Sequence, residues 1–479
     1  MANPDHLEQL RAGSWNEWRA ANPTVAPDLI DAQLAGMDLR GMDLSRAHLR
    51  GADLSGARLD GSNLNLASLD SAIVVGASFV DVTMNQVHLD FLDLSGVDLS
   101  GSVLHSAVFR GANLSGAFLR RADLSQALLE SAIFDGADFT GATLRGASLR
   151  GGRFTRATLR GVQAEAAILE GVELQDLDME AAVFCRAQAS NAQFKNSRLA
   201  RADFRDAVLR GANFHSASLV ESAFDHAQCD GASLSHADLE KASFQGTNLS
   251  QADLRGSSLI GAILDGCTLS GAQLVELDFR SPSVGRVSFA TADLRRSVFT
   301  RCELRSVDFR EANLEEADFR HANLEGAKFR GAKLADATLR HANLKQSDLA
   351  GVVAQGVDLS GTNLILASAA GAKLIGADLR FSDAIGVDLD RADLRWSDLR
   401  NADFTKANLA TARLWGARVR NTKVPTNMGH MVLMLRFSQL FQVLGRRREK
   451  MRQARERKRI RQVAELVRER EATRKRRTR

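Results

Sequence analysis

The 479-residue chain lacks the features that identify most secreted, membrane-spanning and metal-binding proteins. Its four cysteines show no C-x-x-C or other metal-ligand spacing, and so few cysteines are typical of a reducing compartment. No run of about 18 apolar residues occurs. The N-terminal "MANPDHLEQL" has neither the basic nor the apolar segment of a secretory signal. These absences predict a cytoplasmic protein.

Known catalytic motifs are also missing. The chain contains no Walker-type glycine loop, no G-x-S-x-G and no H-E-x-x-H. His321 and His341 lie 20 residues apart, and we interpret them as a surface pair because no third ligand accompanies them. We therefore expect no enzymatic activity, no metal and no cofactor.

Proline is scarce, and its distribution separates a long central stretch of the chain from the two terminal segments. Four of the five prolines lie before residue 28 or at residue 425, and Pro282 alone lies between them. Proline lacks the N–H that strand pairing needs, so the proline-poor stretch suits continuous pairing. We predict a local distortion at Pro282, with a partner-docking notch as the less favoured interpretation.

A five-residue repeat fills this stretch. In "ANLEEADFRHANLEGAKFRGAKL", residues 312–334, alanine recurs at every fifth position and leucine or phenylalanine follows two residues later. The phase continues without insertion for 79 units, from Ala32 to Val424. A helix would scatter these apolar residues around its surface, and one continuous strand would send them to alternate faces. We therefore predict a spiral that bends in every unit and directs both apolar positions inward.

Units such as "ADLSG", "ANLSG" and "ADFRH" resemble the pentapeptide-repeat family, whose consensus is A(D/N)LXX. The resemblance covers about residues 32–424. It implies an all-β solenoid, a right-handed quadrilateral β-helix with four units per coil. Such a chain would form about 20 coils and a rod of about 95 Å.

In this arrangement residues 20 apart stack on neighbouring coils. Phenylalanines at that spacing should form internal aromatic ladders. Their members are Phe184, Phe204, Phe224 and Phe244, then Phe279, Phe299 and Phe319, and Phe289, Phe309 and Phe329. Cys229, Cys267 and Cys302 occupy inward positions and should act as small core residues. Residues 162–190 and 351–371 depart most from the consensus, which indicates relaxed packing or partner contact.

The ends differ from the repeat, and we divide the chain into four parts. Residues 1–26 form an N-terminal helical cap, which resembles the short tryptophan-containing helix that precedes many bacterial pentapeptide arrays. Residues 27–424 form the β-helix. Residues 425–445 form an amphipathic helix and residues 446–479 a basic helical tail, together a C-terminal helical extension. We expect residues 428–445 to fold back over the last coils, with a dimer interface or a membrane-surface helix as alternatives.

Charge is distributed unevenly. Residues 446–479 contain 17 lysines and arginines and 5 acidic residues, so this basic tail carries +12 while residues 1–445 carry −7. Lipid headgroups, nucleic acid or an acidic protein would fit it, and the adjacent amphipathic segment slightly favours a membrane surface, here the inner membrane. The candidate contacts are Arg446, Arg447, Arg448, Arg457, Lys458, Arg459, Arg474, Lys475, Arg476 and Arg477.

Outward apolar residues gather near the C-terminal end of the repeat, and such residues often mark a contact. The candidate interaction patch is Ile365, Ile375, Phe381, Ile385, Trp396, Trp415, Phe437 and Phe441. A column of arginines could follow a phosphate backbone, but aspartates two residues earlier compensate three of its members. The arginines are Arg320, Arg340, Arg380, Arg400 and Arg420, and the aspartates are Asp318, Asp378 and Asp398.

We expect a rod-like scaffold that binds a protein and contacts an anionic partner through its basic tail. Some members of the family that the chain resembles bind type II topoisomerases by imitating DNA, as quinolone-resistance proteins do. This is one alternative, although a body of only −7 and a cationic tail oppose it. A nucleic-acid-associated protein acting through the tail is another. A homodimer joined at the C-terminal end is compatible with the scaffold.

Overall fold

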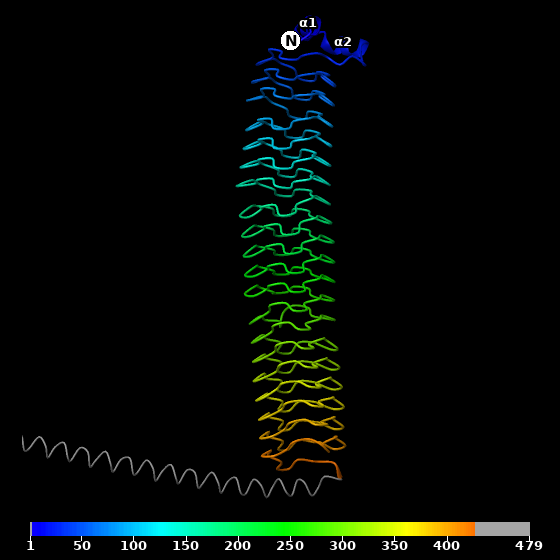
Figure 1. The fold of residues 1–479 in the computed structure, drawn as a ribbon, viewed down its shortest axis with the longest axis vertical. Coiled ribbons are helices and arrows are strands. Elements are labelled where there is room, and N and C mark those ends of the chain that lie inside the picture. Colours follow the sequence, from blue (N-terminus) through cyan, green and yellow to red (C-terminus); the bar gives the residue numbers. More distant parts are fainter. Residues whose placement is uncertain (1, 427–479) are drawn as a thin grey trace, which may run out of the picture.

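The computed structural model of the chain describes residues 2–426. Two short helices, α1 (Pro4–Arg11) and α2 (Trp15–Ala21), lie at one end of a straight rod (Figure 1). Where the sequence predicts one helical segment, Gly13 separates two, because its φ of 77° is available to glycine at little cost. No helix within residues 2–426 has the length and apolar character needed to cross a membrane.

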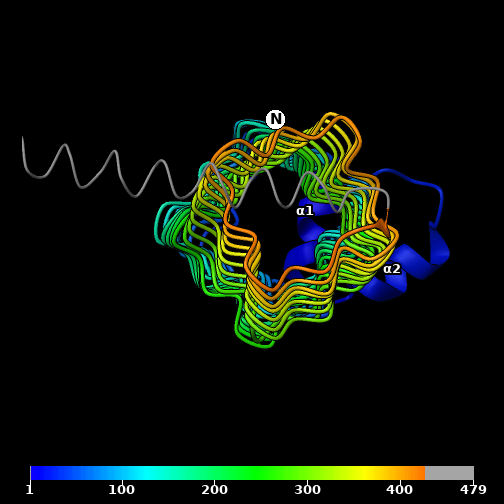
Figure 2. The ribbon, with the colours of Figure 1, turned by 90° about the horizontal axis from the view of Figure 1, so that it is seen from below.

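The rod is built from isolated parallel β-bridges. Each bridge joins residues 20 apart, from Asp28 and His48 at one end to Asp403 and Lys423 at the other. Four five-residue units therefore complete one coil, and Figure 2 shows the coils superimposed around one axis. The predicted solenoid is confirmed. The described residues contain no extended strand, because each unit offers a single bridging residue between two turns.

One left-handed residue in nearly every unit explains the period of five; the corner residues Ser281, just before Pro282, and Thr411 are the exceptions. The residue two places after the large apolar one has a φ near that of Gly36, 66°, or Arg46, 58°. This corner turns the chain, and the next small residue closes the turn through its N–H, as Ala52 does to the Leu49 carbonyl at 3.0 Å. Bonds to adjacent coils, such as Leu34 N–H to Asp53 O at 2.8 Å, stack the units.

The small and large apolar positions fill the interior of the rod. Stacked phenylalanines on successive coils have ring centroids 4.6–5.2 Å apart, as in the pairs Phe279–Phe299 and Phe289–Phe309. Rings in neighbouring columns meet edge to face, as Phe204 and Phe214 do. The predicted aromatic ladders are confirmed, and their offset and perpendicular contacts are the geometries that aromatic rings favour.

Three of the four free cysteines belong to this interior. Cys229, Cys267 and Cys302 are buried, as predicted. Burial raises the thiol pKa of Cys267 to about 12 and that of Cys302 to about 11, because the thiolate would lose its hydration. These thiols therefore stay protonated and unreactive at neutral pH.

The regular ladder is interrupted at Pro282. Residues 280–282 bend in place of the usual turn, and no bridge joins Ser283 to Glu303 in the described range. Pro282 occupies the small position, whose N–H normally closes the turn, so that bond is lost. The Gly261 N–H instead bonds the Ser281 hydroxyl at 2.9 Å. The predicted distortion is confirmed.

A small void lies inside the coils that contain residues 351–371. Ala354 and Ala369 occupy the large position, which Leu349 and Leu374 fill on nearby units. The void has a volume of about 20 Å³ and is lined by leucine, valine, alanine and Phe404 side chains. This supports relaxed packing as the cause of the irregular sequence here.

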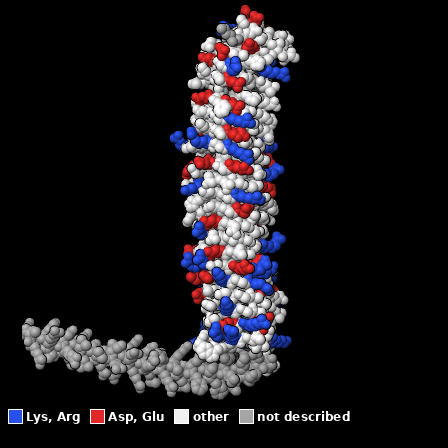
Figure 3. Space-filling model, viewed as in Figure 1, with Lys and Arg blue, Asp and Glu red and all other residues white. Residues whose placement is uncertain are grey.

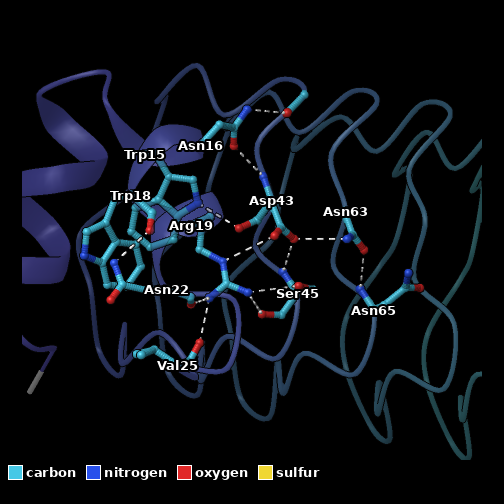
Figure 4. A network of polar contacts seen from close by, with 11 residues as sticks. Trp15, Asn16, Trp18, Arg19, Asn22, Val25, Asp43, Ser45, Asn63 and Asn65 are labelled. Atoms are coloured by element: carbon cyan, nitrogen blue, oxygen red, sulfur yellow. Dashed lines mark hydrogen bonds and ion pairs between the residues drawn. The ribbon is translucent and has the colours of Figure 1, made fainter.

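Helix α2 is tied to the first coils by a polar network (Figure 4). Arg19 is 3% exposed, and its guanidinium donates to Val25 O at 2.6 Å, Ser45 O at 3.2 Å and an Asp43 carboxylate oxygen at 3.4 Å. The Trp15 indole N–H donates to the Asp43 carbonyl at 2.8 Å. These bonds satisfy backbone carbonyls at the end of the ladder, where no further coil could do so.

Candidate interaction surface

Two exposed tryptophans pack together near the C-terminal end of the rod. The ring centroids of Trp396 and Trp415 are 4.3 Å apart at an interplanar angle of 77°. The residues are 43% and 59% exposed. The Trp396 ring covers Gly416, where an added Cβ would lie 2.4 Å from the ring atom Cε3. With half-buried Ile375, in the column of Trp415 two coils earlier, they form what we call the tryptophan corner.

The chain around the tryptophan corner is basic. From residue 404 to residue 448 the sequence contains no aspartate or glutamate. In the described part of this stretch, Lys423 Nζ pairs with Asp403 at 2.8 Å. The exposed side chains of Arg413 and Arg420 make no hydrogen bond or ion pair within residues 2–426. Figure 3 shows lysine and arginine side chains predominating at this end of the visible face.

The carboxylates that remain here are held in the ionised form. Hydrogen bonds from Lys423 and Thr405 lower the pKa of the Asp403 carboxyl to about 2. Burial would raise the pKa of Asp398, but the Arg400 guanidinium outweighs burial and holds this pKa below its usual value. Each of these two carboxylates is thus paired with a cation of the rod.

Other apolar residues of the predicted patch lie on different corners. Ile365 and Ile385 are half-buried and lie two units, or half a coil, from the column of Trp415, so they occupy the diagonal corner. Phe381, 64% exposed, lies on the corner between. Leu366, which is not among the predicted residues, is 58% exposed beside Ile365. The structure thus distributes these residues around the rod.

The remaining predicted residues lie outside the described range. They stay predictions, both for the apolar patch and for the contacts with an anionic partner. They are Phe437, Phe441, Arg446, Arg447, Arg448, Arg457, Lys458, Arg459, Arg474, Lys475, Arg476 and Arg477.

The arginine column is largely neutralised by its own aspartates. Arg320, Arg380 and Arg400 each form a bidentate pair with the aspartate two residues earlier, with Nη2 to oxygen distances of 2.6 Å. Arg340 and Arg420 form no such pair within residues 2–426. The predicted compensation is confirmed, so this column does not present a continuous phosphate track.

Metal-ligating side chains do not cluster in the part of the chain that the structure describes. No group of three histidine, cysteine or acidic side chains in residues 2–426 could hold a metal ion. His321 and His341 stack with ring centroids 5.2 Å apart, in agreement with a surface pair. The internal void is apolar and has room for about one water molecule.

Sequence reasoning missed the contact between Trp396 and Trp415. They are 19 residues apart, so the 20-residue register does not stack them directly. A signal was available in Gly416, which lies 20 residues after Trp396 and leaves room for its ring. A bulky corner residue followed 20 residues later by glycine therefore indicates a side chain lying along the rod.

Most of the chain matches sequence models of one family. The model described as "Pentapeptide repeats (8 copies)" matches residues 28–161, 190–281 and 355–423 in overlapping copies. A second, described as "Pentapeptide repeat region", matches residues 284–352. No curated protein sequence matches the chain.

Solved structures of similar proteins include HetL, a pentapeptide repeat protein involved in heterocyst differentiation regulation from the cyanobacterium Nostoc sp. strain PCC 7120. HetL is 25% identical, and the match covers 56% of this chain and 96% of HetL with a TM-score of 0.23. QnrB1, a plasmid-mediated fluoroquinolone resistance protein, is 20% identical over 46% of this chain and 94% of its own, with a TM-score of 0.24. A pentapeptide repeat protein of the Arabidopsis thaliana thylakoid lumen is 29% identical over 21% and 71%, with a TM-score of 0.15. These TM-scores are low, so the assignment of a family rests on the sequence models.

Proposed function

The chain belongs to the pentapeptide-repeat family, and on this basis we propose that it is a non-enzymatic, rod-shaped scaffold whose C-terminal end binds an anionic partner. The basic tail and the coils around the tryptophan corner make this contact. We favour an anionic membrane surface on the cytoplasmic side as the partner. The rest of the rod then holds a protein partner away from that surface.

Continuity of charge at one end carries the proposal. The stretch without acidic residues, 404–448, leads directly into a tail of net charge +12. A basic segment near an anionic leaflet gains about 1 kcal/mol for each lysine or arginine. Trp396 and Trp415 add exposed rings with a polar N–H, which suit the boundary between lipid and water.

Vesicle flotation tests the proposal. The full chain should float with phosphatidylserine vesicles at low salt, and binding should weaken as salt screens the charges. A chain that stops at Gly445 should lose most of this binding. Replacing both Trp396 and Trp415 with alanine should weaken it several-fold, whereas Phe91→Ala, an 83% exposed residue far from this end, is the matched control.

Failure of every form to float would overturn the membrane assignment. Retention of the full chain on duplex DNA or RNA, lost in the chain that stops at Gly445, would then favour a nucleic-acid-associated protein. A concentration-dependent dimer that dissociates in the double tryptophan variant would instead assign the tryptophan corner to contact between copies.

A DNA-imitating binder of type II topoisomerase is the second candidate. It is favoured by the acidic start of the chain, because residues 2–100 carry a net charge of −8. A gyrase supercoiling assay with the purified chain tests it. If micromolar protein neither inhibits gyrase nor protects it from a quinolone, this candidate is removed.

The finer architecture is also part of the proposal. We infer a right-handed, four-sided helix of about 20 coils, divided as residues 1–26, 27–424, 425–445 and 446–479. The ladder of residues 20 apart and the bonds of Arg19 to the first coils support the first two of these parts, and the sequence alone supports the other two. In it, α1 and α2 cap the N-terminal end and shield its unpaired edge.

A further inference from the structure

A shallow groove of about 460 Å³ lies on one corner of the rod beside the break at Pro282. It is lined by Arg280, Thr300, Arg301, Arg320 and His321, which come from three consecutive coils. We call these five residues the arginine groove. None of its lining residues is acidic, and the proposed C-terminal contact uses none of them.

The sequence at this corner creates the hollow. Thr300 lies between Arg280 and Arg320 in the same column, so one short side chain separates two long ones. Arg301 follows Thr300 at the corner itself, with a φ of 63° that directs its exposed side chain outward. The bend at residues 280–282 replaces the regular turn one coil earlier.

Two of the guanidinium groups are fixed in place by carboxylates. Arg280 and Arg320 bind Asp278 and Asp318 through Nε and Nη2, with Nη2 distances of 2.5 and 2.6 Å. Their Nη1 groups make no hydrogen bond within residues 2–426. The paired edge thus holds each guanidinium while donors on the other edge stay available, so little conformational entropy is lost when an anion binds.

Arg301 distinguishes this corner from other Asp–Arg pairs on the rod. Its side chain has no hydrogen bond or ion pair within the described residues. The corner therefore holds three guanidinium groups and two paired carboxylates, and neither Asp278 nor Asp318 lines the groove. The Thr300 hydroxyl donates to Asp318 at 3.0 Å, so this carboxylate is already bonded by two lining residues, Thr300 and Arg320.

We propose that the arginine groove binds a phosphate-bearing group, and that a compact diphosphate suits it best. Phosphate oxygens match the planar donor fork of arginine, and charge-assisted hydrogen bonds of this kind are about twice as strong as neutral ones. Donors from three coils can engage two phosphates at once. This site is independent of the basic tail and of the partner at the C-terminal end.

Titration calorimetry of the full chain with inorganic pyrophosphate at low salt tests this site. We compare the wild type with Arg301→Gln and with the double variant Arg301→Gln/Arg320→Gln. Arg121→Gln is the matched control, because Arg121 lies in the same corner column nine coils earlier with a φ of 56°. We expect at least a roughly tenfold loss of affinity in Arg301→Gln, a further loss in the double variant and no change in the control.

The source of the phosphate is tested in a second arm. Flotation with vesicles that contain phosphatidylinositol phosphates measures lipid headgroups with the same variants. Sensitivity to Arg301→Gln in the pyrophosphate arm assigns a soluble ligand, and sensitivity only in the vesicle arm assigns a lipid. Absence of binding, or equal binding by all variants in both arms, would overturn the site while leaving the proposed scaffold function standing. Unchanged melting temperatures show that the variants fold.

Discussion

At the scale of single residues, the corner position carries the strongest conformational constraint. Nearly every unit places one residue in the left-handed region, with Ser281 and Thr411 as exceptions, and many of these residues are not glycine, among them Arg301 and Trp396. Each such residue costs roughly 1–2 kcal/mol relative to a right-handed conformation. The bonds to the neighbouring coils offset that cost, which frees the corner to carry arginine, histidine or tryptophan. Surface chemistry can therefore vary without a change of fold.

Gly416 is a corner at which glycine itself is required. In Gly416→Ala, the new Cβ would approach the Trp396 ring at 2.4 Å, and the backbone would remain at a φ of 78°. We expect a loss of about 2 kcal/mol in local stability and an altered tryptophan emission as the ring moves. Gly376→Ala is the control, since this corner has a φ of 70° and nothing within 4 Å of the added atom. Equal effects in the two variants would contradict a role for the ring.

Asp403 makes the C-terminal end sensitive to acid. Its folded pKa of about 2 is below the usual 3.8, so the folded state binds its proton less readily than the unfolded state. The stabilisation is fully present above about pH 4 and is lost as the pH falls towards 2. We expect a contribution of at most about 1 kcal/mol, because solvent screens this pair. Melting between pH 5 and pH 2 should depend less on pH in Lys423→Met.

At the scale of one coil, the interior of the rod contains a small void where alanine replaces leucine. Ala369 lies in the column of Leu349 and Leu389 and borders the void. In Ala369→Leu, three added carbons would fill it, and we expect a gain of about 1 kcal/mol. Leu349→Ala should lose roughly 2–5 kcal/mol because it enlarges the same void. Chemical denaturation measures the free energy of unfolding of both variants. Destabilisation by Ala369→Leu would show that the void cannot hold the leucine side chain.

Helix α2 should stabilise the coils that it contacts and no others. Arg19→Met removes three donors to buried or half-buried oxygens, and we expect a loss of about 2–3 kcal/mol. Coils of a solenoid contact only their neighbours, so hydrogen exchange should rise in residues 28–65 and stay unchanged beyond residue 300. Arg11→Met, at an exposed position in α1, provides the control.

Some features of the coils and of the helices beside them could be predicted from the sequence, and others could not. The unbroken period of five predicted a spiral with both apolar positions inward. The resemblance to the pentapeptide-repeat family supplied four units per coil and with it the phenylalanine ladders, and the missing N–H of Pro282 predicted the local distortion. The break at Gly13 was missed because helical spacing of Leu7, Leu10 and Trp15 continues across it. The sequence predicted a single apolar patch because the 20-residue register tells which residues stack in one column. Residues form one surface only if their columns also lie on the same side of the rod, and those of Ile365 and Trp415 lie on opposite corners. The 20-residue register places Thr300 between Arg280 and Arg320, but the absence of a partner for Arg301 within the described residues is visible only in the structure.

At the scale of the whole molecule, charge changes along the axis. Residues 2–100 carry −8, and the stretch from residue 404 to residue 448 contains no acid at all. A rod of this kind orients in an electric field, so an anionic surface would attract one end and repel the other. The proposed contact therefore fixes the direction in which the rod extends from its partner.

Pro282 divides the ladder into two blocks. The regular bonds from Leu259 N to Asp278 O and from Val284 N to Glu303 O are missing in the described structure. Pro282→Ala would supply an N–H for the Phe279 carbonyl, as Ala292 does for Phe289 at 3.1 Å. We expect the amides of Leu259 and Val284 to exchange about tenfold more slowly in this variant. Unchanged exchange there would show that the break is set by residues other than proline.

The four-unit coil also makes residue number an angular coordinate. The arginine groove and the tryptophan corner face directions one unit apart, because their positions in the 20-residue cycle differ by five. Inserting one five-residue unit between them would leave every inward position filled and rotate the second surface by a quarter turn. Inserting four units would restore its azimuth and displace it by one coil. Two ligands could thus be set facing the same way or at right angles by insertions that leave the core composition unchanged.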